Sequence, residues 1–179
     1  QTYVITVNDV NDSPLRLSST SFSENTAGTV VGDLSIEDSD FAANITYTLS
    51  GDDSASFEVI NGQLKLKSDV SADFESKNTY SINITATDDA NHETSVNFTL
   101  QVTDANDSPT AIELSANNID ENTEGMTVGI LSTSDVDAED DHTYTLSGTD
   151  AASFEVINGE LKLKTDVAAN YETNSTLAV

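Results

Sequence analysis

Residues 56–67 read Ser-Phe-Glu-Val-Ile-Asn-Gly-Gln-Leu-Lys-Leu-Lys, and residues 153–164 repeat this stretch with a single change, Glu160 in place of Gln63. On both sides of Asn61-Gly62 the side chains alternate between apolar and polar, which is the period of a β-strand with one buried face. Asn followed by Gly accepts the positive φ angles of a two-residue type I′ turn. The stretch therefore predicts a β-hairpin, with strands at 57–60 and 63–66, and a second copy of it later in the chain.

The hairpin is part of a longer internal repeat. Tyr47-Thr48-Leu49-Ser50-Gly51 returns 97 residues later at 144–148, and Glu24-Asn25-Thr26 returns with the same offset at 121–123. Asp9-Val10-Asn11-Asp12-Ser13-Pro14 returns as Asp104-Ala105-Asn106-Asp107-Ser108-Pro109 after 95 residues. An ordered match of this length indicates a structural unit of about 95 residues.

The repeat suggests three segments. We expect 1–14 to be the last strand of a preceding repeat plus a linker, because Tyr3–Val7 aligns with 98–102. We expect 15–109 to be one complete repeat with its linker, and 110–179 to be a second, truncated repeat. On this interpretation the chain is a piece of a longer tandem array. The second repeat would lack most of its sixth strand and all of its seventh, which predicts an open edge in that repeat and a partly uncovered core.

The complete repeat is expected to be all-β. Strict alternation marks strands at 80–86 and 96–102, and weaker patterns mark 20–23, 29–36 and 44–50. With the hairpin this gives about seven short antiparallel strands, the number typical of an immunoglobulin-like Greek-key sandwich. Because the chain has no Cys and no Trp, the disulfide-and-tryptophan core of antibody domains is excluded. The expected core consists of Phe22, Leu34, Ile36, Tyr47, Leu49, Phe57, Val59, Leu64, Leu66, Tyr80, Ile82, Ile84, Phe98, Leu100 and Val102.

The charge of the chain restricts its partners. With 32 acidic and 6 basic residues in 179, the formal net charge is −26, which repels nucleic acids and anionic lipids and favours cations. No apolar run is long enough for a transmembrane helix, so we expect no membrane insertion of this segment. The absence of Cys removes disulfides, thiolate zinc sites and thiol nucleophiles. A secreted chain without Cys is more usual in bacteria than in animals, and we expect a bacterial protein.

Many of the acidic residues cluster in loops at the ends of the repeats. Calcium takes about six to eight oxygen ligands from Asp, Glu, Asn and backbone carbonyls. An Asp-x-Asp pair in an extended loop directs two carboxylates to the same side of the chain. The clusters are Glu24; Asp38 and Asp40; Asp73 and Glu75; Asp88; and Asp104, Asn106 and Asp107.

In this order and spacing the motifs resemble those of the cadherin repeat, and the resemblance covers the whole chain. Members of that family carry a Glu in a Pro-Glu-Asn-like turn, an Asp-x-Asp pair, an Asp-x-Glu triplet, an Ala-x-Asp and an Asp-x-Asn-Asp-x-Pro linker. The matching segments are Ser23-Glu24-Asn25, Asp38-Ser39-Asp40, Asp73-Phe74-Glu75, Ala86-Thr87-Asp88 and Asp104-Ala105-Asn106-Asp107-Ser108-Pro109. Ser23 replaces the family's Pro, Ser13 and Ser108 replace a linker Asn, and Asn170-Tyr171-Glu172 lacks the first Asp of its triplet.

The resemblance implies calcium sites, about three ions for each full junction between repeats. At the complete junction the first repeat would supply Glu24, Asp73 and Glu75, the linker Asp104, Asn106 and Asp107, and the second repeat Asp135 and Asp137. The first junction would be half present, with Asp9, Asn11 and Asp12 from the linker and Asp38, Asp40 and Asp88 from the complete repeat.

Electrostatics supports this role for the acidic clusters. Seven carboxylates would converge on the complete junction, and like charges 4–6 Å apart repel by roughly 1 kcal/mol per pair even in water. Calcium ions would cancel most of this charge. We therefore expect calcium to convert a flexible array into a stiff one, at the affinity of extracellular modules, with Kd about 10⁻⁴–10⁻³ M.

Two functions remain open from the sequence. The first is a calcium-binding segment of an extracellular adhesin at the cell surface, whose partners are other repeats of the same or another chain and a cell-surface glycan. The alternative is a carbohydrate-binding or spacer module of a secreted polysaccharide-degrading enzyme, which would need exposed aromatic residues. We do not expect the chain to be an enzyme: His92 and His142 lie in polar loops without a Ser or Cys nucleophile and are expected at the surface.

Overall fold

The computed structural model describes residues 2–5, 14–37 and 44–179. The chain divides into two compact units, Gln1–Ala105 and Asn106–Val179, and each is described by itself. In the described part of the chain the regular structure consists of β-strands and two short 3₁₀ helices. Within those residues no helix has the length and apolar character needed to cross a membrane.

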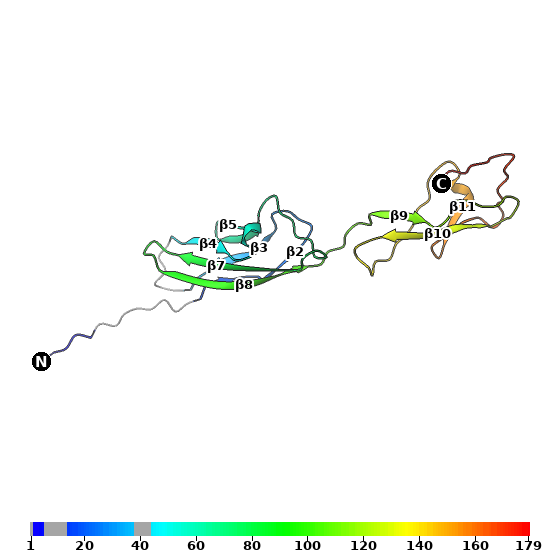
Figure 1. Ribbon diagram of the computed structural model, residues 1–179. Coiled ribbons are helices and arrows are strands. Elements are labelled where there is room, and N and C mark those ends of the chain that lie inside the picture. The colour runs from blue at the N-terminus through cyan, green and yellow to red at the C-terminus, as the bar shows by residue number, and fades with distance from the viewer. Residues whose placement is uncertain (1, 6–13, 38–43) are drawn as a thin grey trace. The chain divides into compact units, whose positions relative to one another are not determined.

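The first unit is a sandwich of two four-stranded sheets (Figure 1). One sheet has the order β1-β3-β6-β5 and is antiparallel throughout. The other has the order β2-β8-β7-β4; β2 is parallel to β8 and the remaining pairs are antiparallel. The strands of the first sheet are β1 (Arg16–Leu17), β3 (Val30–Ser35), β5 (Phe57–Ile60) and β6 (Gln63–Leu66). Those of the second are β2 (Ser21–Ser23), β4 (Thr46–Ser50), β7 (Thr79–Thr87) and β8 (Glu93–Thr103), and the helix η1 (Ser54–Ser56) precedes β5.

This arrangement confirms the predicted all-β, immunoglobulin-like sandwich, with one difference. The sequence predicted about seven strands, the first at 20–23, where the structure has β2. The structure adds β1 before it, and the two belong to opposite sheets. The chain changes sheet at a serine-rich turn, where the Ser19 hydroxyl donates to the Ser21 carbonyl at 2.9 Å. The Ser18 hydroxyl oxygen accepts from the Asp33 N–H at 2.8 Å, which fixes the start of the turn against β3. Serine side chains that bond to nearby backbone are typical of such breaks.

The predicted hairpin is confirmed in both units. Asn61 and Gly62 have φ angles of 52° and 77°, as a type I′ turn requires. In the second unit, Asn158 and Gly159 have φ angles of 53° and 78° and connect β11 (Phe154–Ile157) to β12 (Glu160–Leu163). The same two residues therefore produce the same turn twice.

The core of the first unit lies between its two sheets. Phe22, Phe57 and Tyr80 form an aromatic cluster in which ring centroids are 5.5–6.1 Å apart. Every residue of the expected core belongs to this hydrophobic core. Ten of these residues are buried, and the partly buried ones are Ile36, Tyr47, Leu49, Val59 and Phe98. Sequence reasoning missed the buried residues Leu15, Val31, Ala72 and Ala86.

The second unit has one four-stranded sheet, with the order β11-β12-β10-β9. It adds β9 (Ala111–Leu114), β10 (Thr127–Ser134) and the helix η2 (Ala151–Ser153). Residues 143–147 are identical in sequence to β4, yet they form no strand. In the first unit β4 is hydrogen-bonded to β7, and in the second unit only residues 176–179 align with β7. A strand without a partner has no ladder to join.

The N-terminal strand expected at Tyr3–Val7 is not present in residues 2–5, and residues 6–7 lie outside the described part of the chain. Tyr3, Val4 and Ile5 are 76%, 91% and 85% exposed. Among the described residues no strand pairs with them, so they belong to no sheet.

Candidate metal centre

Glu24 is a buried carboxylate at one end of the first unit. It follows β2 directly and is only 2% exposed. Its Oε1 accepts from the Ala105 N–H at 2.8 Å, and its Oε2 accepts from the Phe74 N–H. Backbone donors on both oxygens compensate for the loss of hydration. Glu24 therefore connects the end of β2 with the 73–75 triplet and with the start of the linker.

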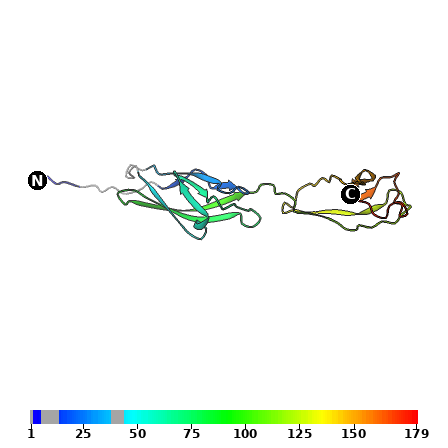
Figure 2. The ribbon, with the colours of Figure 1, turned by 90° about the horizontal axis from the view of Figure 1, so that it is seen from above.

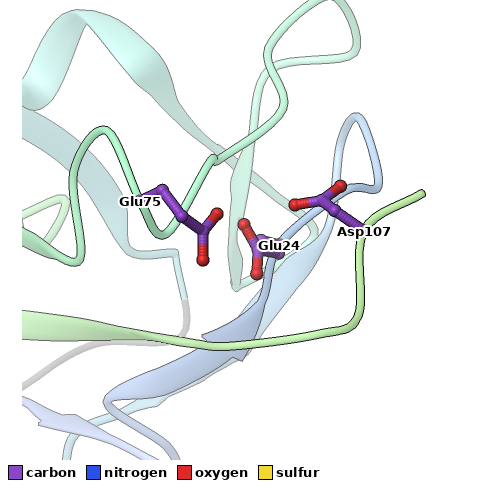
Figure 3. Close-up of side chains that lie close together, drawn as sticks. All are labelled: Glu24, Glu75 and Asp107. Carbon is purple, nitrogen blue, oxygen red and sulfur yellow. The ribbon is translucent and has the colours of Figure 1, made fainter. Parts of the chain in front are cut away.

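Glu75 and Asp104 lie beside Glu24. Figure 3 shows the carboxylates of Glu24 and Glu75 close together, and one oxygen of each lies within 4.8 Å of the other. One oxygen of Asp104 lies within 4.8 Å of a Glu75 oxygen as well. Three carboxylates at such spacing repel one another unless a cation is shared among them. These three residues form the first cluster.

Asp73, a predicted ligand, bonds within its own loop. Its Oδ1 accepts from the Ser76 N–H at 2.7 Å, and its carbonyl oxygen accepts from the Lys77 N–H at 2.8 Å. These bonds close a tight turn at 73–77. Asp73 thus shapes the loop that presents Glu75, and it is absent from the groups of described carboxylates close enough to hold one ion.

In the second unit the linker is attached to the Asp-x-Asp loop. The Asp107 N–H donates to Asp137 Oδ2 at 2.6 Å, and the Asp137 N–H donates to Asp135 Oδ1 at 3.3 Å. The Asp140 N–H then donates to the Asp137 carbonyl at 3.1 Å. The predicted ligands Asp107, Asp135 and Asp137 therefore form a second cluster within this unit.

Asp135 carries an unusual oxygen. Its side chain is 4% exposed, and Oδ2 has no hydrogen-bond partner among the described residues. The nearest cationic candidate is His142 Nε2, at 3.8 Å, which is too long for a hydrogen bond. Both residues line a hollow of about 320 Å³, together with Asn106, Asp107, Asp140 and Asp141. A buried carboxylate oxygen without a donor is costly, and a bound cation would remove that cost.

The donor atoms of both clusters fit calcium. Carboxylate and amide oxygens are hard ligands, and Ca²⁺ accepts six to eight of them in flexible geometry. Zinc prefers about four ligands drawn from Cys and His, and His142 is the one imidazole near either cluster in the part of the chain that the structure describes.

The expected first junction is described only in part. Asp88 is buried and accepts from the Ala90 N–H at 2.9 Å, the His92 N–H at 2.8 Å and His92 Nδ1 at 3.2 Å. It follows the end of β7, whereas Glu24 lies beside the end of β8, so the two acids are at opposite ends of the β7–β8 ribbon. Figure 2 shows these two long strands side by side. The other members, Asp9, Asn11, Asp12, Asp38 and Asp40, lie outside the described residues.

Three residues outside the predicted ligand set, His92, His142 and Glu121, also have polar neighbours. The sequence predicted both histidines at the surface. The His92 side chain is 52% exposed and its Nδ1 contacts Asp88 Oδ2 at 3.2 Å, while the His142 side chain is 25% exposed and its Nε2 lies 3.8 Å from Asp135 Oδ2. Glu121, the counterpart of Glu24, accepts from the Tyr171 N–H at 2.9 Å through Oε2. The repeat of Glu24-Asn25-Thr26 at 121–123 already contained the signal for Glu121.

Comparisons with known proteins agree with this description. Residues 18–103 match the family model described as "Cadherin domain". Among solved structures, the human protocadherin-24 EC1-2 fragment is 21% identical with a TM-score of 0.62, and the match covers 93% of this chain and 82% of that one. The human desmocollin-1 ectodomain is 19% identical with a TM-score of 0.55, over 93% of this chain and 36% of that one.

At these identities the solved structures establish the fold. The family match lies entirely within the first unit, which contains the complete sandwich. Residues 18–103 are thus the part of the chain that matches the cadherin domain family, and the fold is that of cadherin ectodomains.

Proposed function

We propose that this chain is a calcium-binding segment of an extracellular adhesin, in which calcium at the linker between repeats stiffens the array. The linker is the physical reason for placing the ions there. Asp104 ends the first cluster and Asp107 begins the second, and they are three residues apart in the chain. Their Cα atoms can be separated by at most about 11 Å, whatever the orientation of the units.

The observation that carries the proposal is Asp135 Oδ2, a buried carboxylate oxygen with no hydrogen-bond donor among the described residues. Glu24 is equally buried, but backbone N–H groups satisfy both of its oxygens. Asp135 has a backbone donor at Oδ1 alone, the Asp137 N–H at 3.3 Å, so a cation at Oδ2 would complete its site. The surrounding Asn106, Asp107 and Asp137 would supply further hard oxygens.

The role of calcium follows from the charge. Without a cation, the carboxylates of the two clusters repel, and separation of the clusters by bending of the linker lowers that repulsion. With calcium bound, carboxylates of both clusters would coordinate the same ions. Bent conformations of the linker would then become unfavourable. The likeness to cadherin ectodomains supports adhesion outside the cell and repeat-to-repeat contact as the setting for this stiffening.

The alternative of a carbohydrate-binding module receives less support. Such modules stack aromatic rings on sugars. In the described residues the strongly exposed aromatic side chains are Tyr3 and Tyr171, and they do not form a sheet face. The exposed side of β7 and β8 instead carries Ser, Thr and Asn, as in the bond from Asn83 Nδ2 to Asn97 Oδ1 at 2.9 Å.

Isothermal titration of residues 1–179 with calcium tests the proposal. We expect Kd values of about 10⁻⁴–10⁻³ M. Asp137→Asn keeps an oxygen that can accept from the Asp107 N–H but removes a charge, and it should weaken binding roughly tenfold. Glu172→Gln is the matched control and should bind calcium as the parent does. Glu172 is exposed and belongs to the triplet Asn170-Tyr171-Glu172, which lacks the first Asp. Absence of calcium heat at millimolar concentration, or equal losses in both variants, would contradict the proposal.

A further inference from the structure

His142 is a position at which the second repeat differs from the first beside an acidic cluster. The following residues, 143–148, are identical to 46–51, but His142 replaces Ile45. In the first unit Ile45 is a partly buried residue packed against the apolar core. None of the five acidic motifs of the repeat includes this position. The imidazole is therefore a feature of the second unit that the proposed calcium sites do not use.

A hydrogen bond of Tyr144 to β10 places His142 beside Asp135. Asp135 directly follows β10, and the hydroxyls of Tyr144 and Thr133 on that strand are 2.8 Å apart. Tyr144 and His142 line the same hollow. The His142 Nε2 lies 3.8 Å from Asp135 Oδ2, and the two side chains are 25% and 4% exposed.

The distance between these two atoms suits a shared metal ion. At 3.8 Å they are too far apart for a hydrogen bond, and Asp135 Oδ2 has no hydrogen-bond partner among the described residues. Two ligand atoms that each lie about 2.0–2.2 Å from one ion are at most about 4.4 Å apart. An ion between the imidazole and the carboxylate can therefore contact both of them.

The rest of the hollow offers oxygen ligands and room for water. Its volume is about 320 Å³, and its lining also includes Asn106, Asp107, Asp140 and Asp141. All of these residues belong to the second unit, so the site does not require the first. An ion that is held by two side chains needs further ligands, which carboxylate oxygens and waters in such a hollow can supply.

We propose that Asp135 and His142 bind a divalent transition-metal ion of the class of Ni²⁺ and Cu²⁺, in competition with calcium. These ions accept nitrogen and oxygen ligands together, whereas Ca²⁺ takes oxygen ligands. The inference rests on the proposed function in one respect, namely that Asp135 is a cation ligand in both. Calcium uses Asp135 without His142, and the transition-metal ion uses both residues. Its binding removes Asp135 from the calcium site and so lowers the calcium affinity of the second cluster.

The test has to separate the imidazole from the carboxylates, because a net charge of −26 attracts every cation. His142→Gln removes the nitrogen ligand and keeps a polar side chain and all the carboxylates. Asp135→Asn removes the ligand that the two ions share. His92→Gln is the matched control, because it removes the other imidazole of the chain, which is 52% exposed and belongs to the first unit.

Isothermal titration of residues 1–179 with nickel chloride in calcium-free buffer is the first measurement. We expect His142→Gln to weaken nickel binding roughly tenfold or more and to leave the calcium Kd within about twofold of the parent value. Asp135→Asn should weaken the binding of both ions, and His92→Gln should weaken neither. Added calcium should raise the apparent Kd for nickel in the parent.

Broadening of amide NMR signals by paramagnetic Ni²⁺ locates the ion. Signals of residues 133–137 and 140–144 should broaden in the parent and much less in His142→Gln. Three results would overturn the inference: nickel binding that is absent or equal in the parent and His142→Gln, broadening centred on His92, or equal losses of calcium and nickel affinity in His142→Gln. The last result would give His142 a structural role. Nickel binding that depends on His142, together with an absence of calcium heat, would contradict the proposed function and support this inference.

Discussion

Asp135 and Glu24 illustrate, at the scale of single residues, two ways to bury a carboxylate. Glu24 receives two backbone N–H donors and is complete within the protein, while Asp135 keeps one oxygen without a donor among the described residues. The sequence predicted both as ligands from their motifs. It could not distinguish them, because the difference depends on whether a backbone N–H from a distant loop reaches the carboxylate.

Asp135→Asn should therefore have different effects on stability with and without calcium. In EDTA the change removes an uncompensated buried charge, and the second unit should become more stable by about 1 kcal/mol or remain unchanged. In millimolar calcium it removes a ligand and should abolish most of the stabilisation that the ion supplies. Hydrogen exchange of residues 154–163 in the two buffers measures both effects. Destabilisation of the same size in both buffers would show a purely structural role.

Asp53 gives a prediction about pH in the first unit. The hydrogen bond from Lys77 and that from the Ser81 N–H hold the pKa of Asp53 below its usual value. A lowered folded-state pKa contributes stability above the unfolded value, near pH 4, and this contribution is lost as the pH falls through the folded-state pKa. Asp53→Asn should therefore destabilise the first unit by about 1–2 kcal/mol at pH 7 and by less at pH 2–3.

Exchange of the Leu64 and Leu66 amides, which are in the core, monitors this loss. Asp52→Asn is the control because Asp52 is exposed and adjacent. It should change stability by less than about 0.5 kcal/mol at either pH. An Asp53 effect that does not diminish in acid would show that the pair with Lys77 is not its cause.

At the scale of elements, the sequence predicted those features that depend on residues close together in the chain. The sequence predicted the Asn-Gly hairpin, the alternation of β7 and β8 and the core residues in these strands. Each of these signals lies within a few consecutive residues. The additional strand β1 in the opposite sheet could not be predicted, because it depends on how Ser18 and Gly32 meet across β1 and β3. The loss of a strand at 143–147 depends on a distant partner, although its sequence is that of β4.

Substitutions at two glycines, Gly62 and Gly32, distinguish the cost of backbone strain from the cost of steric contact. Gly62 has a φ of 77°, and a Cβ there would meet nothing within 4 Å. Gly62→Ala should cost about 1 kcal/mol through its φ angle alone. At Gly32 a Cβ would lie 2.8 Å from Ser18 Oγ and 2.9 Å from the Ser19 nitrogen. Gly32→Ala must move the β1–β2 turn and should cost more, about 2–3 kcal/mol. Denaturation of both variants compares the two costs, and the reverse order would refute this account of the strand break.

At the scale of the whole molecule, the proposed role of calcium is a change in flexibility rather than in fold. The sandwich of the first unit is held by its apolar core and by paired strands, so removal of calcium should leave it folded. The linker has no such support, because Asp104, Asn106 and Asp107 lie in a segment without strand pairing. The repulsion between the acidic clusters then acts mainly on the linker.

Small-angle scattering of residues 1–179 should accordingly show a broad ensemble in EDTA and a narrower, more extended one in millimolar calcium. Asp137→Asn should require roughly tenfold more calcium for the change, whereas Glu172→Gln should follow the parent. Magnesium at equal concentration is a further control, since it demands a smaller octahedral shell and should narrow and extend the ensemble less than calcium does. Identical profiles in EDTA and calcium would remove the stiffening role even if calcium binds, because a bound ion that leaves the linker equally free does not restrict the motion of the two repeats.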